Sequence, residues 1–124
     1  MNTQEAKQTY GEMQKGLIAG LKDAKAAVQW LEQNPAQAGC VSADYLQLWG
    51  NLVGGWLMAK SLIIAQQQLD QGVGDNGYLE AKLVTCKFYT QHFLVRTHTC
   101  LASIRAGGDT TMSLAEEQFF SHVN

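Results

Sequence analysis

The sequence nearly lacks proline: Pro35 is the only one in 124 residues. Proline interrupts helices more strongly than any other residue, so long helices are permitted on both sides of this position. A chain of this length can bury one core, but it cannot hold a catalytic domain together with a cofactor domain. We therefore expect a single domain over residues 1–124.

A charge excess of one sign is also absent. Nine Lys and Arg residues against eleven Asp and Glu residues give a net charge of −2, and the basic residues are scattered along the chain. A nucleic-acid interface needs a concentrated basic patch, so we expect no nucleic-acid partner. The first residues are polar, include Glu5 and Glu12, and lack an apolar signal core. The default expectation is a cytoplasmic protein.

The cysteines and histidines lack the spacing of a metal or redox site. Cys40, Cys86 and Cys100 are an odd number without a C-x-x-C pair, and His92 and His98 lie six residues apart instead of four. No nucleophile and base are arranged for a catalytic triad. We expect reduced thiols, with zinc or redox chemistry as the less favoured alternative. The expectation is therefore no catalytic, cofactor-binding or metal-binding residue in this chain.

Apolar periodicity predicts helices and no strands. Apolar residues recur every three or four positions from residue 3 to about 34, from 36 or 42 to 70, and from 78 to 106. The glycine-rich sequence QGVGDNG at 71–77 predicts a loop. Ser113 and Glu116 have the spacing of a capping box, which predicts a short helix over 114–120. The predicted fold is all-α, an up-and-down bundle of three long antiparallel helices plus a short C-terminal helix.

Residues 45–65, YLQLWGNLVGGWLMAKSLIIA, are long and apolar enough to raise the question of a membrane span. Gln47, Asn51 and Ser61 interrupt the run, and Lys60 would cost about 2.5–3.5 kcal/mol inside a bilayer. We therefore predict the buried central helix of a bundle, and no membrane span.

Glycines recur at a spacing of four in the first and second predicted helices. Glycine in a helix interior costs about 0.8–1.0 kcal/mol relative to alanine, so these positions need a reason. Small residues at this spacing let two helices approach closely, and we predict helix crossings here, with bulky tryptophans filling the space beside them. The predicted helix-packing residues are Gly16, Gly20, Trp49, Gly50, Gly54 and Trp56.

Two segments resemble a known family. Residues 45–57, YLQLWGNLVGGWL, and the closing segment 82–119, with Met112, Leu114 and Phe119 around an adjacent glutamate pair, resemble the C-terminal accessory domain of acyl-CoA dehydrogenases. The branch concerned is the large one that includes the 3-methylmercaptopropionyl-CoA dehydrogenases. That family often has proline where this chain has Val95, which leads us to expect a straighter third helix.

The resemblance implies a parent protein in which FAD, the acyl-CoA thioester and the glutamate base lie in domains N-terminal to this one. No catalytic residue carries over, so the enzyme status of the isolated chain stays open. The expected role is structural or in oligomerisation, with the remaining domains of the parent and a homodimer as partners. One alternative is a free-standing bundle that binds a partner protein or a small apolar ligand, such as an acyl chain or haem near Trp49, Trp56 and Phe93. Another is a peripheral membrane module.

Overall fold

The computed structural model describes residues 3–120, and this part of the chain is helical without strands. The all-α prediction is confirmed. The long helices are α1 (Thr3–Gln33) and α2 (Ala38–Asp70), followed by α3 (Asn76–Tyr89) and α4 (Arg96–Ala106). Three short elements join or follow them: the 3-10 helix η1 (Pro35–Gln37), the π-helical segment η2 (Thr90–Leu94) and the 3-10 helix η3 (Glu116–Phe120).

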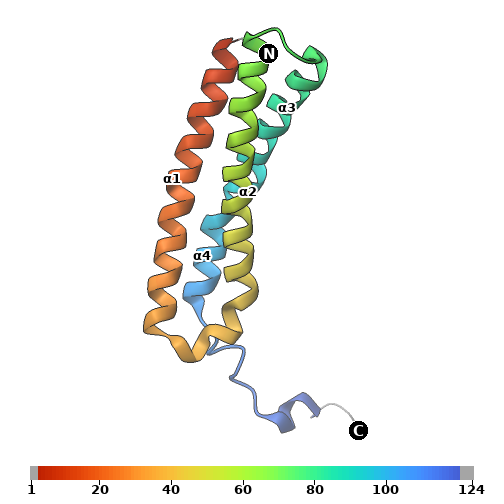
Figure 1. Cartoon of the computed structure of the whole chain (residues 1–124). Coiled ribbons are helices and arrows are strands. Elements are labelled where there is room, and N and C mark those ends of the chain that lie inside the picture. The colour runs from red at the N-terminus through yellow and green to blue at the C-terminus, as the bar shows by residue number, and fades with distance from the viewer. Residues whose placement is uncertain (1–2, 121–124) are drawn as a thin grey trace.

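Helix α2 lies at the centre of the structure. Figure 1 shows α1 running along one side of α2, with α3 and α4 following each other along another side. Helix α2 contacts α1, α3, η2 and α4, and α4 also contacts α1. Because α2 touches every other long element, its side chains decide how the bundle closes.

The connections have local sequence causes. Pro35 begins η1, where its missing N–H is tolerated in a first helical turn. Between α2 and α3, Gly72 and Gly74 have positive φ angles of 65° and 84°, a conformation that glycine adopts without steric cost. The Asp75 carboxylate then accepts a hydrogen bond from the Gly77 amide at 2.9 Å and caps α3.

The core divides into two clusters along the length of the bundle. The cluster near the α1–α2 connection brings alanines of α1 against larger side chains: Ala24, Ala27, Val41, Leu48, Leu52, Leu94, Cys100, Leu101 and Ile104. The other lies toward the α2–α3 connection and contains Ala6, Met13, Ala59, Leu62, Ala65, Leu79, Leu83 and Cys86. Leu17 packs against both clusters and joins them.

The predicted straight third helix is wrong. The helix is interrupted by η2, and Val95 lies in a turn between η2 and α4. A π-helical segment inserts one extra residue into a helix and thereby shifts which residues face the core. Thr90 and Leu94 of this segment are both buried. The proline-to-valine departure does not straighten this helix, because the interruption precedes Val95.

The predicted helix over 114–120 is not confirmed, since the structure has the 3-10 helix η3 in its place. The Ser113 hydroxyl donates a hydrogen bond to the Thr110 carbonyl at 2.7 Å instead of capping a following helix. Gly107, with a φ of 74°, ends α4 as a glycine in this position is expected to do. Beyond Gly108, the segment 109–120, which we call the tail, leads away from the bundle (Figure 1).

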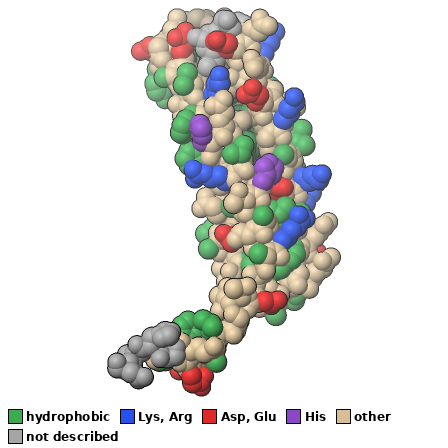
Figure 2. Space-filling view, turned by 180° about the vertical axis from the view of Figure 1, so that it is seen from behind, with side chains coloured by type: hydrophobic (Ala, Val, Ile, Leu, Met, Phe, Trp, Pro, Cys, Tyr) green, Lys and Arg blue, Asp and Glu red, His purple; other side chains and the backbone are tan. Residues whose placement is uncertain are grey.

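One helical stretch, Pro35–Asp70, is long and apolar enough by length and composition to cross a membrane. A third of its most apolar window is buried in the bundle. Core helices of water-soluble bundles meet the same criterion, so this finding does not by itself assign a membrane. Figure 2 shows the opposite face of the molecule, where basic side chains are spread along the length instead of forming one patch.

Candidate functional site

Leu94, at the end of η2, is a buried side chain that packs against glycines of two helices. A Cβ atom added to Gly16 of α1 would lie 2.8 Å from Leu94 Cδ2, and one added to Gly55 of α2 would lie 2.7 Å from Leu94 Cδ1. Leu94 is 1% exposed. One leucine side chain therefore fills the space left by two glycines on different helices, an arrangement we call the Leu94 contact.

Two further glycines lie against side chains of neighbouring helices. A Cβ on Gly20 would lie 3.0 Å from Leu52, and one on Gly54 would collide with the Tyr89 hydroxyl. That hydroxyl donates a hydrogen bond to the Asn51 carbonyl at 2.9 Å. The predicted glycine positions thus meet leucine and tyrosine side chains, whereas the prediction had the glycines of the two helices facing each other.

The prediction for Gly50 is wrong within this chain. No heavy atom of a neighbouring element comes within 4 Å of a Cβ placed there. The sequence interpretation assigned Gly50 and Gly54 to one face, but the neighbouring helices reach only the Gly54 side of α2. Gly55, which lies in the family-like segment 45–57 but was not among the predicted packing residues, makes the close contact with Leu94.

The two tryptophans predicted to pack beside the glycines, Trp49 and Trp56, differ in how far they are buried. Trp49 is partly buried against the core and has its ring 6.4 Å from the Tyr45 ring in an edge-on arrangement. Its indole N–H is buried and has no hydrogen-bond partner within the described chain. Trp56 is 52% exposed, and the Lys60 ammonium lies 4.2 Å from its ring centroid. Trp56 is therefore largely exposed, whereas the prediction had it filling the space beside a helix crossing.

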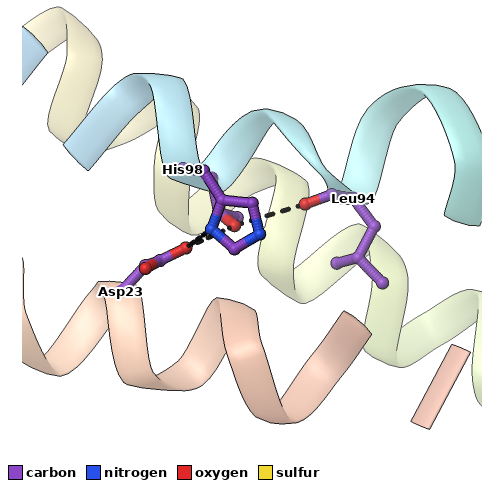
Figure 3. A network of polar contacts seen from close by, with 4 residues as sticks. Asp23, Leu94 and His98 are labelled. Carbon is purple, nitrogen blue, oxygen red and sulfur yellow. Dashed lines mark hydrogen bonds and ion pairs between the residues drawn. The ribbon is translucent and has the colours of Figure 1, made fainter. Parts of the chain in front are cut away.

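Sequence reasoning missed a polar link between α1 and α4. Asp23 Oδ2 pairs with His98 Nδ1 and accepts a hydrogen bond from the Thr97 hydroxyl at 3.0 Å (Figure 3). The Thr97 hydroxyl also contacts the Leu94 carbonyl, at 3.3 Å. Asp23 and His98 lie too far apart in sequence for any local pattern to relate them.

The link between Asp23 and His98 resembles part of a catalytic triad only in composition. The one hydroxyl in it belongs to Thr97, which is fully buried and occupied by Asp23 and the Leu94 carbonyl. A nucleophile must instead be exposed to a substrate and activated by its base. The arrangement can join two helices, and it has no free nucleophile.

The cysteines are free, and no group of three His, Cys, Asp or Glu side chains among residues 3–120 could hold a metal. Cys40 is exposed, while Cys86 and Cys100 are buried. Burial raises the pKa of the Cys86 thiol, although Lys82 acts in the opposite direction. The Cys86 thiol contacts the Met58 carbonyl at 3.3 Å. Buried thiols of raised pKa are poor nucleophiles and ligands.

A groove of about 300 Å³ lies between the first half of α1 and the second half of α2. Its lining is mostly apolar and includes Ala6, Tyr10, Leu62 and Ile63, with Lys7 and Asp70 among its polar residues. The sequence prediction for a ligand site named Trp49, Trp56 and Phe93, and none of them lines this groove.

These contacts join the helices of the described chain to one another. Residues 1–115 match the family described as Acetyl-CoA dehydrogenase C-terminal like. A relative from Ruegeria pomeroyi, named 3-methylmercaptopropionyl-CoA dehydrogenase, is 33% identical over 119 residues, which cover 85% of this chain and 20% of the relative. The chain belongs to the acetyl-CoA dehydrogenase C-terminal-like family, and the resemblance stated from its motifs is confirmed. It spans about a fifth of the length of this curated relative.

Proposed function

We propose that this chain is a structural domain of an FAD-dependent acyl-CoA dehydrogenase-like protein and is not catalytic by itself. Its family membership and its match to a fifth of a larger dehydrogenase support this role. In this proposal the remaining domains of the parent carry FAD, the acyl-CoA and the catalytic base. The domain comprises residues 1–124 as an up-and-down bundle of antiparallel helices. It serves fatty acid metabolism in the cytoplasm, without spanning a membrane, and supports oligomerisation as a dimer.

The observation that carries this proposal is the apolar character of the tail. Met112, Leu114, Phe119 and Phe120 are all exposed, and the tail leads away from the bundle (Figure 1). A group of large apolar side chains left uncovered by its own chain is typical of an interaction site. We assign the remaining domains of the parent as the partner that covers the tail.

A chimeric dehydrogenase tests this assignment. The Ruegeria pomeroyi relative would be prepared in three forms: intact, without its matching fifth, and with this chain in place of that fifth. We expect the chimera to recover the melting temperature and flavin content that the truncated form loses. A chimera indistinguishable from the truncated form would contradict the proposal.

A matched pair of variants shows whether the tail is responsible. Replacing Leu114 and Phe119 by serine removes two exposed apolar side chains from the tail, and we expect the chimera to lose the recovered melting temperature. Replacing Ile18 and Leu21 by serine removes two exposed apolar side chains from α1 instead. Equal losses from both pairs would show that the tail has no specific role.

The isolated chain gives a second test, which concerns the binding of FAD. Purified in the presence of excess FAD and then passed through a desalting column, it should retain no flavin absorbance. A yellow protein with a flavin spectrum would overturn the assignment of FAD to the remaining domains.

A free-standing bundle that binds a small apolar ligand is the second candidate, and the groove between α1 and α2 is the observation that favours it. Its volume of about 300 Å³ is at the lower limit of ligand sites. A fluorescent fatty acid should then bind saturably, and Ile63→Lys should abolish this binding because Ile63 lines the groove. Absence of saturable binding by the unchanged chain would remove this candidate.

A further inference from the structure

Helix α2 carries a row of uncovered residues on the side that faces away from the core. Leu46, Val53, Leu57 and Ile64 are 74%, 46%, 52% and 53% exposed. Residues separated by three, four or seven positions lie on one face of a helix. Gly39 and Gly50 belong to the same face. We call this row the outer stripe: Gly39, Leu46, Gly50, Val53, Leu57 and Ile64.

No neighbouring element packs over the two glycines of the outer stripe within the described chain. A Cβ atom placed on Gly39 or Gly50 would meet nothing within 4 Å, whereas Gly54 and Gly55 lie directly beneath Tyr89 and Leu94. Gly39 is the second residue of α2, whereas Gly50 lies in the helix interior. Glycine is among the least favourable residues in a helix interior, so an open glycine at position 50 has no advantage in the isolated bundle. Close approach of another backbone or a bulky side chain would explain these open glycines, as Tyr89 and Leu94 explain Gly54 and Gly55.

The spacing along the outer stripe is the same read in either direction. Successive members are 7, 4, 3, 4 and 7 residues apart. We propose that the outer stripe binds the outer stripe of a second copy of this chain, with the two α2 helices antiparallel and centred between Gly50 and Val53. In this register Val53 of each copy lies over Gly50 of the other, Ile64 lies over Gly39, and Leu46 lies beside Leu57.

The register pairs each open glycine with a β-branched side chain and each leucine with a leucine. A parallel pair would instead place glycine opposite glycine and valine opposite valine, which leaves gaps at one level and crowding at the next. The antiparallel arrangement is also isologous, because both copies use the same surface. Side-chain size along one helix therefore selects both the partner and its direction.

Charge does not oppose this pairing. Between Asp44 and Asp70, α2 contains a single charged residue, Lys60. Its ammonium lies over the Trp56 ring, beside the outer stripe. In the proposed register Lys60 comes opposite Ala43, so no like charges meet across the pair.

The proposed interface is small. A contact along one helix buries less than the roughly 800 Å² per partner of a standard interface, so we expect a weak dimer that dissociates on dilution. This inference rests on the proposed structural role, but it uses α2 and leaves the tail free. The chimera experiment above and the experiments below can therefore fail separately.

Disulfide cross-linking tests the register. In a Cys40→Ser background, which removes the exposed thiol, Leu46→Cys chains would be mixed with Leu57→Cys chains and oxidised. We expect a covalent dimer in the mixture and none from either variant alone. Two copies of the same cysteine would be about 16 Å apart along the axis at 1.5 Å per residue, beyond the roughly 7 Å limit for a disulfide.

The cross-linking outcomes are decisive in both directions. Dimers from Leu46→Cys alone would indicate a parallel pair and overturn the proposed register. No dimer in any sample, at concentrations above 100 μM, would overturn the interface itself.

Sedimentation equilibrium tests the contribution of side-chain size. Gly50→Leu and Val53→Glu should each raise the dimer dissociation constant at least tenfold, because one blocks the close approach and the other introduces a charge. Ile18→Glu on the exposed side of α1 is the control and should leave the constant unchanged. Circular dichroism of each variant shows that the helices are retained. A dissociation constant unaffected by Gly50→Leu would contradict the proposal.

A membrane surface is the competing occupant of the outer stripe, and vesicles of phosphatidylcholine distinguish it. We expect the unchanged chain to stay in solution when the vesicles are sedimented. A monomer that sediments with vesicles, and loses this property on Val53→Glu, would replace the second copy by a lipid surface and overturn the proposal.

Discussion

Glycine occurs on both sides of α2, but in different surroundings. On the covered side, Gly54 and Gly55 lie against Tyr89 and Leu94, and any added Cβ atom would collide with them. On the outer side, Gly39 and Gly50 face nothing in the described chain. Glycine in a helix therefore marks close approach only where a neighbour is present, and the sequence does not show which neighbour.

The comparison also explains why α2 carries apolar residues on its outer side as well as on its covered side. A helix in a bundle normally has one apolar stripe and one polar face. The covered side of α2 packs against α1, α3, η2 and α4. The outer side is also apolar, but it is exposed in the described part of the chain. We interpret that second apolar side as an interface.

The largest effect is expected from Leu94→Ala. The Leu94 side chain is buried against two glycines, which have no side chains that could move to fill the cavity. We expect a loss of about 4 kcal/mol in the free energy of unfolding, near the upper end for leucine-to-alanine changes. Urea unfolding followed by circular dichroism measures it, and a loss below about 1 kcal/mol would show that the Leu94 contact contributes little.

The second prediction concerns the coupling of Gly55 to Leu94. Gly55→Ala should destabilise the unchanged protein by about 1–2 kcal/mol, because its new methyl group would lie 2.7 Å from Leu94 Cδ1. In the Leu94→Ala background the same change should stabilise by up to about 1 kcal/mol through helix propensity. A double-mutant cycle in urea measures the difference. Equal effects in both backgrounds would show that the two residues do not touch.

The third prediction is a fall in stability at high pH. Burial raises the pKa of the Cys86 and Cys100 thiols and of the Tyr89 hydroxyl in the folded state. The unfolded chain then releases its protons first, so the free energy of unfolding falls as the pH rises above the ordinary thiol pKa of about 8.5. Urea unfolding at pH 8 and pH 10 measures this fall. Cys86→Ala should make it shallower, and an identical fall in that variant would remove Cys86 as a cause.

The smallest expected effect comes from Gly50→Ala. The added methyl group meets nothing within 4 Å, so only helix propensity changes. At concentrations where the chain is monomeric, the free energy of unfolding should rise by about 0.8–1.0 kcal/mol. Gly54→Ala is the matched comparison on the covered side and should destabilise the protein, since its methyl group would collide with the Tyr89 hydroxyl. An increase in the free energy of unfolding for both variants would show that the two sides of α2 do not differ in packing.

The sequence predicted the helices well because periodicity is a local property. Apolar spacing placed α1 and α2 with little error, and QGVGDNG predicted the turn that contains Gly72 and Gly74. The same pattern could not reveal η2, since a π-helical segment uses ordinary helix-forming residues and depends on how Leu94 packs. Helix propensity is similar in both conformations, and tertiary contacts decide between them.

The site was harder to predict, because it depends on the rotation of one helix against another. Gly16, Gly20 and Gly54 lie against neighbours, but their contacts are leucine and tyrosine side chains, and Gly50 has none. The Asp23–His98 link joins residues that are 75 positions apart in the sequence. A single sequence contains neither the rotation nor the pairing, since both follow from packing between elements.

The most direct test compares Gly50→Leu with Gly55→Leu in urea, at a concentration low enough for the chain to be monomeric. If α2 has one side filled by its own chain and one side left open, Gly55→Leu should lose about 3 kcal/mol or more of the free energy of unfolding. Gly50→Leu should stay within about 1 kcal/mol of the unchanged protein. A comparable loss from both variants would contradict the account, because it would show that the outer side of α2 is covered in the isolated chain.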